Sequence, residues 1–166
     1  MSAAFDIRAC ERADLDGVLA IYNEVIRHST AVFSDIEVTL ENRRAWLEAK
    51  AGAGHPVLVA CDGAAVLGFA TYGEFRTWPG YRYTVEHSVH VDARHRGRGI
   101  GSALVVRLLE LAAQSGKHAM IAGIDAANSG SLRMHARLGF REAGILHEVA
   151  YKFGRWLDLK FLERLI

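Results

Sequence analysis

The feature that most constrains this chain is a glycine-rich stretch from Arg96 to Ser102, which stands between two regular patterns. Residues 84–91 before it alternate as a strand does, and leucines recur at helical spacing after it: Leu104, Leu108 and Leu111. Its glycines occupy alternate positions: Gly97, Gly99 and Gly101. A strand that turns through glycines into a helix leaves the first helical amides without partners inside the helix. Such a turn is suited to binding a phosphate group.

Three phosphate ligands compete for this turn. A Walker A loop ends in Gly-Lys-Ser/Thr, which is absent here. A dinucleotide fingerprint, G-x-G-x-x-G, fails in both registers, because Ser102 or Leu104 stands where the third glycine should be. The pyrophosphate of coenzyme A is the third ligand. The glycines alone are equally compatible with a plain turn between strand and helix.

Charge and composition narrow the partners. The 166 residues carry a formal net charge of +1 and are 51% hydrophobic, which predicts one soluble domain over residues 1–166 and no nucleic-acid binding. A single basic cluster on this nearly neutral chain favours a small anionic ligand: Arg94, Arg96 and Arg98. The histidines show no H-E-x-x-H or similar spacing, so no metal is expected.

Location follows from three further features. No apolar run approaches the roughly 20 residues that span a bilayer. Early charges between Met1 and Arg12 argue against a signal peptide. Cys10 and Cys61 lie far apart and fit small core residues in a reducing compartment. We therefore expect a cytoplasmic protein with no membrane association.

The pattern of the whole chain predicts a mixed α/β (α+β) fold. Strands are expected at residues 5–9, 57–61, 66–72, 84–91, 117–124, 140–151 and 156–162. Helices are expected after Asp14 and after Thr39, each a candidate N-cap, after the glycine-rich turn, and from Asn128, which can cap a short helix that ends at Gly139. The order gives a central mixed sheet of about seven strands flanked by about four helices.

Two segments resemble the signatures of the GNAT acetyltransferases. Arg96–Gly101 is similar to the Q/R-x-x-G-x-G/A signature, and Asn128–Phe140 is similar to the Asn-led helix that ends in Gly-Phe. Tyr83–Val89 and Lys152–Leu159 resemble the phosphinothricin and methionine sulfoximine/sulfone branch. The resemblance covers nearly the whole chain. It implies the GNAT fold, acetyl-CoA as co-substrate, a small amino-acid-like acceptor and a homodimer.

The resemblance also implies which residues bind acetyl-CoA. In GNAT enzymes the glycine turn holds the pyrophosphate on backbone amides, and the preceding strand lines the acetyl and pantetheine arm through its backbone. The cofactor-binding positions are Val89, His90, Val91, Arg96, Gly97, Arg98, Gly99, Ile100, Gly101, Ser102 and Asn128. A strand amide near Val89 is placed to stabilise the oxyanion of a tetrahedral intermediate.

Two side chains are candidates for catalysis. An amine attacks a thioester only when it is unprotonated, so the enzyme needs a base near the acceptor. Glu86 lies in mid-strand just before the glycine turn and matches the catalytic base of the family. Without the resemblance, the competing interpretation is a surface carboxylate paired with an arginine. His135 stands where many GNAT enzymes carry a tyrosine, and it is a candidate to protonate the leaving thiolate or to assist the base.

Other residues are expected to contact the acceptor. An arginine fork suits a carboxylate or a sulfone or phosphinate group, and aromatic rings suit the wall of a side-chain pocket. The acceptor-binding candidates are Phe75, Arg76, Thr77, Trp78, Arg82, Glu86, His87 and Ser88. Strand alternation places His87 and Ser88 on opposite faces, so one of them is expected to act only through its backbone.

Two rival functions stay open. A protein or peptide Nα-acetyltransferase on the same fold needs an open groove for its polypeptide acceptor. A non-catalytic CoA-binding sensor tolerates Glu86→Gln, because nothing has to be deprotonated.

Overall fold

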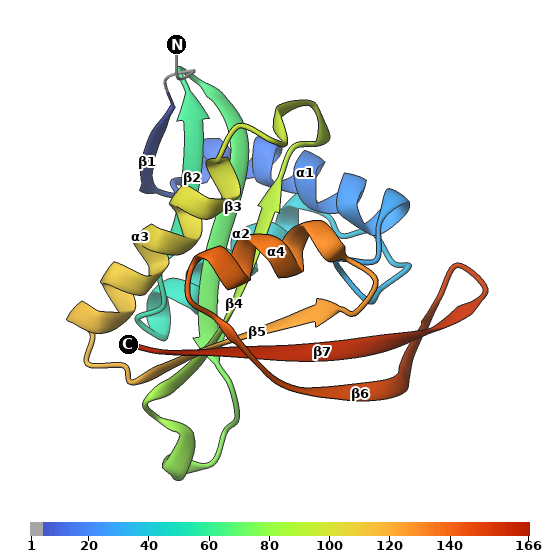
Figure 1. The fold of residues 1–166 in the computed structure, drawn as a ribbon. Helices are drawn as coiled ribbons and strands as arrows, with labels where there is room; N and C mark the ends of the chain where they lie inside the picture. The colour runs from blue at the N-terminus through green and yellow to red at the C-terminus, as the bar shows by residue number, and fades with distance from the viewer. Residues whose placement is uncertain (1–4) are drawn as a thin grey trace.

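The computed structural model describes residues 5–166; the first four residues of the amino-terminal stretch considered for a signal peptide lie outside them. One mixed sheet carries helices on both faces (Figure 1). Its strands are β1 (Asp6–Ala9), β2 (Val57–Asp62), β3 (Ala65–Glu74), β4 (Thr84–Val91), β5 (Ala119–Asp125), β6 (Arg141–Lys152) and β7 (Arg155–Leu165). The α-helices are α1 (Leu15–His28), α2 (Leu40–Gly52), α3 (Ile100–Gln114) and α4 (Ser129–Arg137). The predicted mixed class and element order are confirmed.

The order of the sheet creates an opening in its middle. The strands follow one another as β1-β2-β3-β4-β5-β7-β6, and β4 and β5 are parallel while the other neighbours are antiparallel. The β4–β5 pairing extends only over Thr84–Glu86 and Ala119–Ile121. Beyond Glu86 the two strands part, so the edge of β4 that faces β5 has no ladder partner there.

The two faces of the sheet have separate cores. On one face α3 packs over β2, β3 and β4, with α4 beside it, and Leu104 and Leu108 of α3 are buried with Met120. On the other face α1 packs Val18 and Ile21 into a second cluster. Apolar residues at helical spacing on α1 and α3 bury one stripe of each helix, which is what fixes both helices to the sheet.

Three of the four predicted helix ends are confirmed. The Thr39 hydroxyl accepts from the backbone N–H of Asn42 at 3.1 Å at the start of α2. The Asn128 side chain accepts from the N–H of Ser131 at 3.1 Å at the start of α4. Gly139 follows α4 with a φ of 82°. The side chains of Thr39 and Asn128 thus satisfy backbone amides that the helices themselves leave unpaired.

The prediction that Asp14 caps α1 is wrong. Its carboxylate makes two bonds of 2.7 Å to the Arg8 guanidinium and accepts from the N–H of Glu11 at 2.8 Å. Asp14 thus closes a short 3-10 turn, Arg12–Asp14, and makes no side-chain cap to α1. The ion pair outcompetes the cap because a guanidinium offers two charged donors at once.

Some strands differ in length from the prediction. β3 and β7 extend beyond 66–72 and 156–162 because each is paired with a neighbour along most of its length. Within residues 5–166, no helix has the length and apolar content required to cross a bilayer.

Candidate active site

The glycine-rich turn joins β4 to α3 and presents free amides. Gly99 is the residue before α3 and has a φ of 80°, a left-handed conformation that favours glycine. The backbone N–H of Ala103 donates to the Gly99 carbonyl at 3.0 Å, which closes the first helical turn. The preceding amides, of Ile100, Gly101 and Ser102, therefore have no acceptor within the helix. With the dipole of α3 behind them, they form a site suited to a phosphate.

Gly101 brings α3 close to α4 and β4. A methyl group at this position would lie 3.2 Å from Sδ of Met134 and 3.6 Å from Cγ2 of Val91. A larger side chain would push α4 away from the start of α3. The glycine therefore keeps the turn, β4 and α4 packed together at the same end of the β4–β5 opening.

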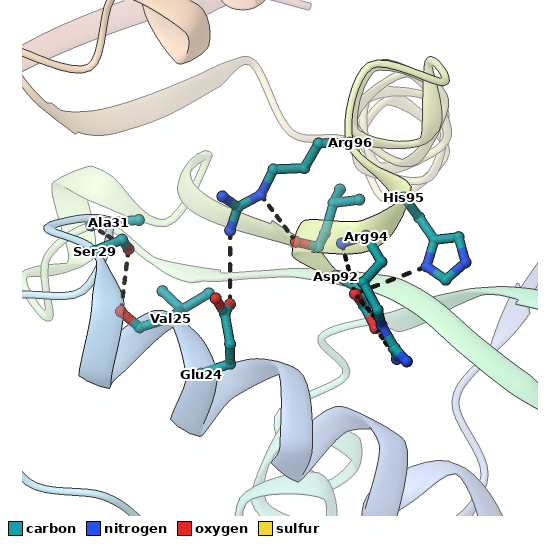
Figure 2. Close-up of polar contacts among 9 residues, drawn as sticks. Glu24, Val25, Ser29, Ala31, Asp92, Arg94, His95 and Arg96 are labelled. Carbon is teal, nitrogen blue, oxygen red and sulfur yellow. Dashed lines mark hydrogen bonds and ion pairs between the residues drawn. The ribbon is translucent and has the colours of Figure 1, made fainter.

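Two arginines of the basic cluster, Arg94 and Arg96, have partners in this structure (Figure 2). The Arg94 guanidinium is bonded to the Asp92 carboxylate at 2.6 Å. Nη2 of Arg96 lies 3.6 Å from Oε2 of Glu24 on α1, and its Nε donates to the Val91 carbonyl at 3.4 Å. Oε2 of Glu24 is buried and has no other hydrogen bond among the described residues. Arg96 thus connects the turn to the helix on the opposite face of the sheet.

A narrow cavity of about 70 Å³ lies where β4 and β5 part. Its lining comes from both strands, from α4 and from the segment after α1: Ala31, His87, Ser88, Val89, His90, Ala122, Gly123, Ile124, Asp125, Asn128, Ser131 and His135. The cavity therefore includes Val89, His90 and Asn128, which the sequence predicts as cofactor contacts. The His90 ring packs against Phe69 at 5.2 Å, so His90 has only its backbone to offer a ligand.

Glu86 lies at the point where the two strands separate. Its carboxylate lies over Gly123 of β5, where a methyl group would be 3.0 Å from Oε1. Burial raises the pKa of Glu86 above its usual value, and the positive charge of Arg76 partly offsets this effect. A half-buried carboxylate with a raised pKa is suited to accept a proton.

His87 and His135 form a buried pair on the α4 side of the sheet. Nε2 of His87 lies 3.1 Å from Nε2 of His135, and Nδ1 of His135 lies 2.8 Å from the Ser131 carbonyl. A carbonyl only accepts, so Nδ1 of His135 carries its proton and its Nε2 accepts the N–H of His87. Nδ1 of His87 is then a buried acceptor that has no partner among residues 5–166.

Both rings of this pair are neutral near pH 7. Burial lowers the pKa of His87 to about 3, with the charges of His135 and His90 adding to the effect. Burial also lowers the pKa of His135. Because the His87 ring lies beside His135 on the α4 side, it faces away from Glu86, as strand alternation predicts. Only the backbone of His87 is left on the acceptor side.

The loop after β3 brings some of the predicted acceptor contacts to Glu86. The Phe75 ring packs edge-on against Phe161 of β7 at 6.2 Å, and the Arg76 guanidinium stacks on Phe75 at 4.2 Å. Trp78 is 74% exposed. The Arg82 guanidinium stacks on Tyr83 at 4.5 Å. The predicted acceptor contacts that do not line the cavity are Phe75, Arg76, Thr77, Trp78, Arg82 and Glu86. The loop exposes Arg76, Thr77, Trp78 and Arg82 to solvent.

Six residues that line the cavity were not predicted from the sequence: Ala31, Ala122, Gly123, Ile124, Asp125 and Ser131. Asp125 ends β5, and ligands of open α/β sheets bind beyond the carboxyl ends of strands, so this position could have been singled out. Ala31 lies in a segment without periodicity, where the sequence offers no comparable signal. Among residues 5–166, no three His, Cys, Asp or Glu side chains are grouped as a metal site requires.

Comparisons with known proteins agree with this geometry. Residues 18–140 match the model of the acetyltransferase (GNAT) family. The chain is 48% identical to an L-methionine sulfoximine/L-methionine sulfone acetyltransferase of Pseudomonas paraeruginosa, over 98% of this chain and 94% of that protein.

Two solved structures are also similar. A Sinorhizobium meliloti phosphinothricin acetyltransferase in complex with acetyl-CoA has a TM-score of 0.95 and 32% identity, covering 100% of this chain and 89% of that one. A Brucella melitensis protein named ribosomal-protein-alanine N-acetyltransferase has a TM-score of 0.95 and 44% identity, covering 97% and 99%.

Proposed function

The chain belongs to the GNAT acetyltransferase family, and from this premise we propose that it acetylates the α-amino group of a small amino acid of the methionine sulfone, methionine sulfoximine or phosphinothricin type. Acetyl-CoA is the co-substrate. One observation carries the proposal: the unpaired edge of β4 runs from Glu86, where β4 and β5 part, to the glycine-rich turn that precedes α3. We take residues 1–166 as one catalytic domain.

The chain's own groups fit acetyl-CoA as a substrate. The free amides from Ile100 to Ser102 are placed to hold its pyrophosphate, with Arg96 nearby. Further along, the unpaired edge of β4 offers backbone donors and acceptors to an extended pantetheine arm, much as another strand would. The acyl end then reaches the part of the opening that Glu86 borders.

Glu86 is the proposed general base. An α-ammonium group that enters beside β4 gives its proton to the carboxylate, directly or through water, and the free amine attacks the thioester carbonyl. The carbonyl oxygen gains negative charge, and we assign its stabilisation to a backbone N–H near Val89. Collapse of the intermediate breaks the C–S bond, forms the amide and releases the CoA thiolate; the second proton of the attacking nitrogen leaves to the thiolate or to water.

We place His135 on the leaving-group side of the reaction. It lines the cavity from α4, across the sheet from Glu86. In its neutral form its N–H is bonded to Ser131 and its other nitrogen accepts from His87, so His135 gives a proton to the thiolate only after gaining a second one. Ser131, whose hydroxyl lies 3.3 Å from Nδ1 of His135, is within reach of the same ring.

A second candidate acceptor is the amino terminus of a protein. The name of the similar Brucella melitensis protein, a ribosomal-protein-alanine N-acetyltransferase, favours it. The small cavity favours the small acceptor, because a polypeptide needs an open groove. The hydrogen bond from Thr30 to Asp125, which holds the segment after α1 against the cavity, favours it as well. Glu86 serves as base in both cases, so the acceptor has to be decided by experiment.

We also propose a cytoplasmic homodimer. Large apolar side chains lie exposed on the β6–β7 hairpin, and a contiguous apolar patch of this kind marks an interaction surface: Val149, Tyr151, Phe153 and Trp156. The supply of acetyl-CoA and the two free cysteines favour a reducing compartment. Sedimentation equilibrium checks the dimer, and a monomer at micromolar concentration contradicts it.

A panel of acceptors tests the function. Thiol release from acetyl-CoA is followed with methionine sulfone, methionine sulfoximine, phosphinothricin, the common amino acids and a peptide with amino-terminal alanine. We expect the highest kcat/KM with the sulfone, sulfoximine or phosphinate compounds. Turnover of the peptide alone would replace the small acceptor by a polypeptide, and tight acetyl-CoA binding without any turnover would indicate a sensor.

A further inference from the structure

The segment that connects α1 to α2, residues 29–38, contains no helix or strand, yet half-buried polar side chains hold it at both ends. At its far end the Asn23 amide group pairs with the backbone of Val38, donating to its carbonyl and accepting from its N–H, both at 2.9 Å. At its near end the Ser29 hydroxyl donates to the Val25 carbonyl and accepts from the N–H of Ala31, both at 3.1 Å (Figure 2).

The near end forms part of the wall of the cavity. Ala31 lines the cavity together with Ser88 of β4 and Gly123 of β5. Its neighbour Thr30 donates its hydroxyl proton to the carboxylate of Asp125, the last residue of β5. Asp125 is 5% exposed, so this bond ties the segment to the inner end of β5 away from water.

Lys152 holds the other side of Ala31. Its ammonium group donates to the carbonyl of Ser29 at 2.7 Å and to that of Val32 at 2.8 Å. Lys152 is 1% exposed. Burying an ammonium group costs free energy, which these charge-assisted hydrogen bonds offset. The chain thus uses a buried cation to bind two carbonyls of one short segment.

The position of Lys152 is itself fixed by a tight turn. It is the last residue of β6, and a two-residue turn leads into β7 with φ of 53° at Phe153 and 73° at Gly154. Positive φ at both central residues is the geometry of the hairpin turns that match strand twist. Lys152 is therefore delivered to the segment by a short hairpin turn at the end of a paired strand.

We propose that Lys152 and Asp125 clamp residues 29–32 and thereby fix Ala31, so that Lys152 is a positioning residue that determines which acceptor side chains fit. This inference rests on the proposed function. A wall that cannot retreat discriminates between acceptors of different length, whereas a wall that moves accepts them more equally. One methylene in a well-fitted pocket is worth roughly 10- to 200-fold in kcat/KM.

The experiment compares Lys152→Met with Lys160→Met, a half-buried control in which the lost ammonium group, among residues 5–166, bonds only to Glu142. It measures KM for methionine sulfone, KM for acetyl-CoA, and the ratio of kcat/KM between methionine sulfone and leucine. For Lys152→Met we expect KM for the sulfone to rise about tenfold and the ratio to move about tenfold toward one, because a small displacement of a positioning wall has effects of this size. KM for acetyl-CoA should change less than twofold, and Lys160→Met should match the wild type.

A second pair of variants keeps the test decisive if Lys152→Met does not fold. Thr30→Val removes the bond to Asp125 and should reproduce the change in selectivity, whereas Thr30→Ser keeps the hydroxyl and should restore it. Unchanged selectivity in Lys152→Met and Thr30→Val, or an equal rise in both KM values, overturns the clamp. Wild-type protein that acetylates none of these amino acids overturns the proposed function instead.

Discussion

A methyl group at Gly123 tests the position of Glu86 without altering its chemistry. In Gly123→Ala the new Cβ would lie 3.0 Å from Oε1 of Glu86, 3.4 Å from Cδ1 of Leu159 and 3.7 Å from Cε1 of Phe161. The last two contacts are ordinary, so the carboxylate is the group that has to retreat, by a few tenths of an ångström. A misplacement of 1 Å at a reacting centre costs about 100-fold in rate, so this shift should lower kcat about fivefold.

The same variant should change the pH profile. The methyl group removes water from the Glu86 carboxylate, which favours its neutral form and raises its pKa further. The acid limb of kcat/KM should therefore move to higher pH. Initial rates of thiol release between pH 6 and 9, at saturating acetyl-CoA, measure both effects.

A matched control separates position from folding. Gly144→Ala places a methyl group on β6 where nothing lies within 4 Å, so it should leave kcat unchanged. Alanine suits a strand better than glycine by about 0.5–1 kcal/mol, so neither variant should melt at a much lower temperature. If Gly123→Ala keeps wild-type kcat and pH profile, the carboxylate of Glu86 is not at the reacting centre.

Two further predictions concern the titration of buried groups and the glycine turn. Burial lowers the pKa of His87 to about 3 and that of His90 to about 4, so both rings stay neutral in the folded protein at pH 5. In the unfolded chain the same rings take up protons below about pH 6.5, so the unfolded state binds more protons there. Each histidine should therefore lower the free energy of unfolding by about 2 kcal/mol between pH 7.5 and pH 5. Urea unfolding at pH 7.5 and pH 5 checks this, and equal stabilities contradict it. Glu24→Gln removes a carboxylate that competes with phosphate for Arg96. KM for acetyl-CoA should therefore fall by up to about fivefold, which corresponds to the free energy of a half-exposed ion pair. A rise in this KM would mean that Glu24 orients Arg96 for the ligand.

Local patterns were sufficient to predict the parts of the site that lie within one element. Strand alternation on β4 predicts that Glu86 and His87 face opposite sides of the sheet, and the structure places the His87 ring beside His135 on the α4 side. The glycines of the turn and the Asn128 cap likewise follow from short-range rules about backbone conformation and unpaired amides.

Contacts between distant segments were beyond the reach of such rules. Lys152 bonds to Ser29, which is 123 positions away, and the segment it holds has no periodicity to predict its path. The Asp14 cap failed for another reason: Arg8, only six positions earlier, takes its carboxylate in an ion pair. Long side chains such as Arg82 have no fixed direction in sequence, so their place in an exposed loop could not be foreseen.

Replacement of Glu86 by glutamine tests the central claim most directly, because it keeps the shape of the side chain and removes only its ability to accept a proton. Turnover of methionine sulfone and the calorimetric Kd for acetyl-CoA are measured on the same preparation. If Glu86 is the general base, kcat should fall about 100- to 10,000-fold, the rate contribution of a positioned general base, while Kd for acetyl-CoA stays within twofold. Undiminished turnover, or a loss of acetyl-CoA affinity as large as the loss of turnover, would contradict it.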